Sequence, residues 1–176
     1  MRVPFLFAFA CSLVTLPAQI GTTSVNDVGL TMQIGLPTSL SPVAGQACGP
    51  FTCTPFPSGS LTTTAASLVR TVRVYGDANS LYVLAMSTGP IVQPCVPIPG
   101  IGNALILGAP MVVVAFGVTG PYLPSTSLAC HQGVGTVQLT LPPVSPSVIP
   151  FRIQALTYSF LTQGPAFTVA IQGYAH

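Results

Sequence analysis

Charged side chains are almost absent from this chain, and their scarcity limits what it can fold into more than any motif does. The 176 residues include two acidic ones, Asp27 and Asp77, four arginines, and no lysine or glutamate. Lys and Glu are good helix formers, whereas Thr, Val and Ile, which are plentiful here, favour strands. Nineteen prolines and 17 glycines add frequent chain breaks. The sequence therefore favours an all-β fold over a helical one.

Residues 1–18 have the layout of a secretory signal peptide. Arg2 supplies a positive charge, residues 3–16 form an apolar stretch, and Ala18 and Gln19 follow it. We expect cleavage between Ala18 and Gln19, because a small residue precedes the cleaved bond in such signals. The apolar stretch is shorter than the ~20 residues that a membrane span needs. We therefore expect the mature protein to be secreted or to lie at the cell surface.

A second uncharged apolar stretch covers residues 101–118 and could be mistaken for a membrane helix. Glycine, asparagine and proline residues interrupt it, which favours two buried strands at 104–107 and 111–116 around a turn. We expect no membrane span in the mature chain.

Four cysteines remain after the predicted cleavage: Cys48, Cys53, Cys95 and Cys130. An even number of cysteines in an oxidising compartment predicts disulfide bonds, and three pairings are open. A turn-forming Gly-Pro-Phe-Thr segment separates Cys48 from Cys53 and favours a bridge between them, which would leave Cys95 with Cys130. A zinc site is the alternative, but zinc sites use closer cysteine pairs or clustered histidines.

Short strand patterns separated by turn signals follow one another along the chain. About eight are expected, at 30–34, 68–75, 81–86, 104–107, 111–116, 136–141, 151–158 and 167–171. This spacing predicts a single antiparallel β-sandwich, immunoglobulin-like or jelly-roll-like. We expect residues 19–66 to form an irregular Pro-, Ser- and Thr-rich segment packed on the domain, residues 67–176 to form the sandwich core, and residues 94–100 to be a proline-rich connection.

Three segments, at residues 81–90, 95–104 and 151–170, resemble a family of secreted, low-charge β-sandwich domains found in planctomycete-type bacteria. The resemblance spans roughly residues 74–172. The family has no assigned activity, so the resemblance implies export and a β architecture but no site residues.

The few titratable residues do not form a recognisable catalytic pattern. Asp77 lies in a Gly-Asp-Ala-Asn turn signal, His131 is expected in a solvated loop, and His176 is the last residue. Arg70 and Arg152 lie in predicted strands, where we expect them to point outward with their stems on the sheet. We expect no catalytic residues, no cofactor and no metal.

These expectations favour a non-enzymatic structural or interaction domain of the cell exterior. Basic residues are too few for nucleic-acid binding, which needs clustered Lys and Arg. Low charge leaves little repulsion between copies, so self-association or a cell-envelope partner is expected. The alternative is a module that binds a glycan or another small ligand through loops at one end of the sandwich. A hydrolase is less favoured, because acids and bases are so scarce.

Overall fold

The computed structural model describes residues 28–36, 43–47, 49–57, 69–121, 133–141, 149–161 and 164–175. Every element of regular secondary structure in these ranges is a β-strand, which confirms the predicted all-β class. They are β1 (Gly29–Ile34), β2 (Val43–Gln46), β3 (Phe56–Pro57), β4 (Val69–Gly76), β5 (Leu81–Ser87), β6 (Ile91–Pro97), β7 (Ala104–Leu107), β8 (Met111–Val118), β9 (Gly120–Pro121), β10 (Gly133–Thr140), β11 (Ile149–Ser159), β12 (Gly164–Phe167) and β13 (Ile171–Ala175). None of the described residues forms a helix that could cross a membrane.

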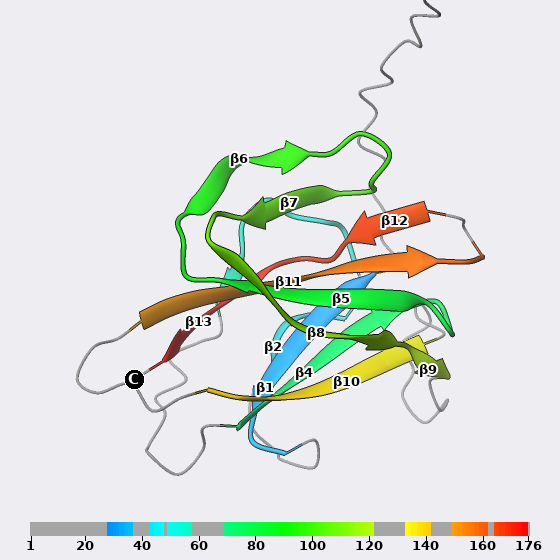
Figure 1. The fold of residues 1–176 in the computed structure, drawn as a ribbon, viewed down its shortest axis with the longest axis horizontal. Coiled ribbons are helices and arrows are strands. Elements are labelled where there is room, and N and C mark those ends of the chain that lie inside the picture. Colours follow the sequence, from blue (N-terminus) through cyan, green and yellow to red (C-terminus); the bar gives the residue numbers. More distant parts are fainter. Residues whose placement is uncertain are drawn as a thin grey trace, which may run out of the picture.

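The strands form three layers (Figure 1). Sheet A has the order β2-β1-β4-β10-β9, and sheet B has the order β3-β13-β11-β5-β8, with β12 also pairing with β11. The hairpin β6-β7 forms the third layer. Pairing is antiparallel throughout, except between β3 and β13. Sheets A and B face each other, and the predicted β-sandwich is confirmed.

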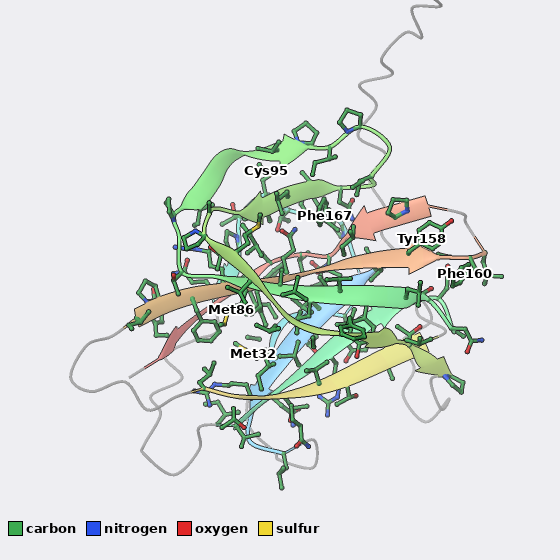
Figure 2. All side chains as sticks on the ribbon, viewed as in Figure 1. Met32, Met86, Cys95, Tyr158, Phe160 and Phe167 are labelled. Carbon is green, nitrogen blue, oxygen red and sulfur yellow. A yellow bond between two sulfur atoms is a disulfide. The ribbon has the colours of Figure 1, made fainter. Side chains whose placement is uncertain are left out.

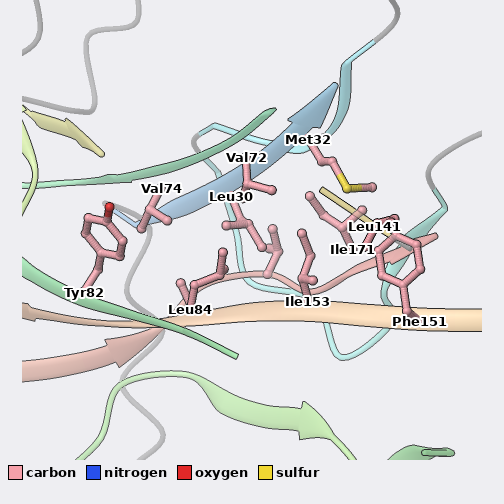
Figure 3. Close-up of a cluster of buried hydrophobic side chains, with 12 residues drawn as sticks. Leu30, Met32, Val72, Val74, Tyr82, Leu84, Leu141, Phe151, Ile153 and Ile171 are labelled. Atoms are coloured by element: carbon pink, nitrogen blue, oxygen red, sulfur yellow. The ribbon is translucent and has the colours of Figure 1, made fainter. Parts of the chain in front are cut away.

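The main core lies between sheets A and B, because alternate residues of each strand point inward. Figure 3 shows side chains from both sheets meeting there. The buried members of this core are Leu30, Met32, Val72, Val74, Tyr82, Leu84, Leu141, Phe151, Ile153, Ala155, Val169 and Ile171. Each large aliphatic side chain buried in this way contributes roughly 1.5–3 kcal/mol relative to its exposed state. The sandwich therefore rests on apolar burial between its two sheets.

The N-terminal segment supplies strands as well as loops. The strand predicted at 30–34 is confirmed as β1, which lies between β2 and β4 in sheet A and buries Leu30 and Met32 in the core. Strands β2 and β3 also belong to the 19–66 segment that we expected to be irregular. Both strands are short. A segment rich in Pro, Ser and Thr gives no clear strand pattern over so few residues.

The C-terminal strand differs from the prediction in a similar way. We expected one strand at 167–171, but β12 ends at Phe167 and β13 begins at Ile171. Between them, the Thr168 hydroxyl accepts a hydrogen bond from the Ala155 amide at 3.0 Å, and the Thr168 amide donates to the Ala155 carbonyl at 2.9 Å. The Thr168 hydroxyl thus replaces one backbone acceptor in the hydrogen-bond ladder of the sheet. A pattern of apolar and polar residues does not show such an interruption of a strand.

Tyr82 links the two sheets from the inner face of β5. A Cβ atom on Gly117 of β8 or on Gly135 of β10 would overlap the Tyr82 ring or its hydroxyl. The two glycines therefore provide the space that the ring occupies, one from each sheet. Burial also raises the pKa of the Tyr82 phenol through desolvation.

The hairpin β6-β7 packs on the outer face of sheet B over a second buried cluster, made of Cys95, Ala104, Ile106 and Ala170. Residues 94–97 belong to β6, so the connection expected at 94–100 is in part a strand. The register between β6 and β7 shifts between Ile91 and Val96, which is the irregular, edge-type pairing that accommodates proline.

Gln154 of β11 attaches this third layer to sheet B. Its buried side-chain amide accepts a hydrogen bond from the Ile106 amide at 3.0 Å and donates to the carbonyls of Ala104 and Thr168, both at 2.9 Å. No backbone ladder joins β7 to β11 among the described strands. The Gln154 amide therefore satisfies backbone groups that a neighbouring strand would otherwise pair.

We predict that Gln154→Met destabilises the protein by about 2–5 kcal/mol, because it leaves buried backbone donors and acceptors without partners at similar side-chain volume. Urea unfolding followed by circular dichroism measures the change. Gln138→Met, at an exposed position on β10, is the matched control. A loss for Gln154→Met no larger than that of the control would contradict this role.

Candidate functional site

Cys53 and Cys95 form a disulfide bond with their Cα atoms 5.5 Å apart. This pairing corrects our expectation that Cys48 would bond to Cys53 and Cys95 to Cys130; Cys48 and Cys130 themselves lie outside the described residues. Closeness in sequence suggested the short bridge, but the fold brings other residues together. Phe51 packs against the cluster that contains Cys95, which places the segment around Cys53 beside the β6-β7 hairpin (Figure 2 labels Cys95). The predicted cleavage site at Ala18 and Gln19 also lies outside the described residues.

We predict that peptide mapping without reduction recovers a peptide that joins Cys53 to Cys95. The bond closes a loop of 42 residues, and the chain-entropy argument gives about 4 kcal/mol of stabilisation for a loop of this length. The double variant Cys53→Ala/Cys95→Ala should lose a comparable free energy of unfolding, measured by denaturant titration. Recovery of a peptide joining Cys48 to Cys53 would contradict the assignment.

Asp77 forms part of a hydrogen-bonded turn between β4 and β5, as the sequence predicted. Its carboxylate accepts a hydrogen bond from the Ser159 hydroxyl, and its carbonyl accepts one from the Thr119 hydroxyl. Thr119 also bonds to Ser80 through backbone groups and through its hydroxyl, and Asn79 takes a positive φ of 64°. The polar groups here fasten the β4-β5 turn to the ends of β8 and β11.

The arginines have structural partners as well. Arg152 points outward from β11, as predicted, and donates hydrogen bonds to the Gln172 amide oxygen at 3.1 Å and to the Gly89 carbonyl. Arg70 departs from the prediction: it is buried, because it shares a face of β4 with Val72 and Val74. Burial lowers the pKa of the Arg70 guanidinium through desolvation.

Among the described residues, no three His, Cys, Asp or Glu side chains lie close enough together to hold a metal ion. His131 and His176 lie outside those residues, so their expected roles stay predictions. The polar clusters that the structure does describe join strands and turns to one another.

The outer faces of the two sheets differ sharply in chemistry. On sheet A the outward side chains are polar, and neighbouring strands bond through them. The Arg73 guanidinium donates to the Gln33 amide oxygen at 2.7 Å, and Thr31 donates to the Tyr75 hydroxyl at 3.3 Å. Thr136 and Gln138 of β10 lie opposite Arg73 and Thr71 in the same sheet. The outer face of sheet A is therefore polar: Thr31, Gln33, Thr71 and Tyr75 are buried, and the β10 positions Thr136 and Gln138 are exposed.

The outer face of sheet B carries apolar side chains across three neighbouring strands. The strand register places Val118, Leu81 and Tyr158 in one row across β8, β5 and β11. A second row contains Phe116, Val83 and Leu156, of which Leu156 is half-buried. Such cross-strand neighbours lie within side-chain contact of one another, so the rows form a continuous surface.

Phe160 extends this surface beyond the end of β11. Its ring meets that of Tyr158 edge to face, with the ring centres 5.3 Å apart, and Figure 2 shows the two side chains near that end of the strand. We define the apolar patch as the exposed residues of this surface: Leu81, Val83, Phe116, Val118, Tyr158 and Phe160. Phe116 is 82% exposed and Phe160 is 59% exposed, which are high values for phenylalanine.

Only part of this outer face is covered. At Gln154 the hairpin β6-β7 lies on it, whereas the apolar patch, whose Tyr158 and Phe160 follow Gln154 by four and six residues, has no such layer among the described residues. The patch is bordered by β8, the last strand of sheet B in the described part of the chain. Strand β8 contains no charge and no proline, and its Met111, Val112 and Val113 are exposed. Charges and prolines are the usual protection of edge strands.

The sequence did not reveal this surface. Residues 111–116 were expected to form a buried strand, and they do form a strand, but much of it is exposed. A continuous apolar run is compatible with a central strand or with an uncovered edge, because its pattern contains no information about the neighbouring layer. Only the strand order decides between them.

Comparison of the chain with protein-family models, with curated proteins and with solved structures finds no match. The resemblance inferred from the sequence therefore stays a prediction.

Proposed function

We propose that this chain is a non-catalytic interaction domain of the cell exterior and that it binds its partner through the apolar patch. The observation that carries the proposal is the apolar surface across β8, β5 and β11, which no other described part of the chain covers. Contiguous surfaces of this kind, when they approach or exceed several hundred Å², mark interaction sites on soluble proteins. Export through residues 1–18, if it occurs as we expect, would place this surface outside the cell.

The energetics favour a partner that covers the patch. Apolar surface removed from water contributes roughly 25 cal/mol per Å², and two phenylalanines that are more than half exposed supply much of that surface. Aromatic side chains are also the residues that most often dominate binding energy at interfaces. In an isolated domain, a polar residue such as threonine would serve equally well at these two exposed positions.

The chemistry of the patch favours a protein partner over a glycan. A small-ligand site needs several placed polar groups to fix the orientation of the ligand, whereas the outward side chains of the patch supply one hydroxyl, that of Tyr158. The carboxylate of Asp77, the one acidic side chain among the described residues, accepts a hydrogen bond from the Ser159 hydroxyl. The side chains of the patch can therefore recognise a partner through apolar contact.

The proposal predicts position-specific cross-linking in the cells that make the protein. Replacing Phe116 with the photo-reactive residue p-benzoylphenylalanine should give a defined adduct on irradiation, because a partner lies against that side chain. The matched control places the same residue at Thr136, an exposed position on the polar face of sheet A. Mass spectrometry identifies what is attached.

Absence of adducts at position 116, or equal yields at both positions, would contradict the proposal. An adduct at position 116 alone supports it, whether the attached molecule is another protein or a second copy of this chain.

A further inference from the structure

We propose that the apolar patch binds the same patch on a second copy of this chain, so that sheet B of one copy packs face to face on sheet B of the other. This inference rests on the proposed function and names the partner. It follows from three properties of the described surface, namely its charge, its area and its layer geometry.

The charge of the patch suits an identical partner. In a two-fold symmetric interface, residues near the axis meet their own copies, so any charge there faces a like charge. None of the six patch residues is charged, and the nearest described charges are engaged within the fold, as in the bond between Ser159 and Asp77. A strongly charged partner would find no opposite charge to pair with, whereas a second copy meets no repulsion.

The area of the patch is close to what a stable dimer needs. From the exposed fractions of its six residues, the patch presents roughly 600 Å² of surface, most of it apolar, at the upper end of what monomeric proteins expose in one place. A standard interface buries about 800 Å² on each partner, including a polar rim. The patch and its border can therefore form such an interface without any rearrangement of the sheet.

The layer geometry shows how sheet B accepts a covering layer. The outward face of β11 already carries the hairpin β6-β7 near Gln154, above a cluster of small and aliphatic side chains. Sheets pack face to face about 10 Å apart when apolar side chains interdigitate. Two copies related by a two-fold axis would bring each Phe116 against the apolar rows of the other copy and complete the uncovered half of the same face.

Sedimentation velocity of the purified, oxidised full chain tests the inference, with the wild type compared with two variants. The wild type should sediment as a dimer at micromolar concentration. Phe116→Ser/Val83→Thr should weaken the dimer at least about 30-fold, because it removes a central aromatic anchor from each copy. Thr136→Ser, on the polar face of sheet A, should leave the dimer unchanged. Circular dichroism melting shows whether both variants fold.

A wild type that stays monomeric at about a hundred times the micromolar concentration at which we expect the dimer would overturn the inference. So would a dimer that persists in the folded Phe116→Ser/Val83→Thr variant, because association would then depend on other residues. A monomer that still gives an adduct with a different protein at position 116 would overturn this inference alone and leave the proposed function standing.

Discussion

The burial of apolar side chains between sheets A and B is the interaction on which the rest of the structure depends. The chain has almost no charged side chains, so neither ion pairs nor a strongly hydrated surface can contribute much to the folded state. The stabilisation comes instead from strands that alternate apolar and polar residues, because each strand turns its apolar face to a shared core. Leu30, Val72, Leu84 and Ile153 show the outcome, since all four are fully buried and they come from both sheets.

Neutral polar side chains take over the connecting roles that charges have in many domains. The Gln154 amide joins β11 to β7, the Thr119 hydroxyl holds the β4-β5 turn, and the Thr168 hydroxyl replaces a ladder partner of Ala155. Amides and hydroxyls lose less hydration free energy on burial than ions do, provided that each finds a partner. A chain poor in charges can therefore still build a specific fold, because nearly all of the buried polar side-chain atoms in its described residues have hydrogen-bond partners, the Ser80 hydroxyl oxygen being the exception.

The sequence predicted the fold class, the sandwich and most of the long strands, because hydrophobic alternation is a local property. It could not predict the third layer, since β6 is rich in proline and its attachment depends on Gln154, which looks like an ordinary polar residue of a strand. It also misplaced the Cys53–Cys95 bond, which is set by how the segment around Phe51 packs on the hairpin. The candidate site was missed for a related reason, because the exposure of Phe116 depends on which strands lie beside and above β8.

The account depends most on the claim that the apolar patch on the outer face of sheet B is not covered by the described residues of one copy of the chain. Hydroxyl-radical footprinting at the lowest workable concentration measures this directly, by comparing side-chain oxidation at Phe116 and Phe160 with that at Phe151 in the core. The structure, in which Phe116 is 82% exposed and Phe151 is 3% exposed, predicts rapid oxidation of the first two and protection of the third. Protection of Phe116 equal to that of Phe151 in the dilute monomer would contradict the account.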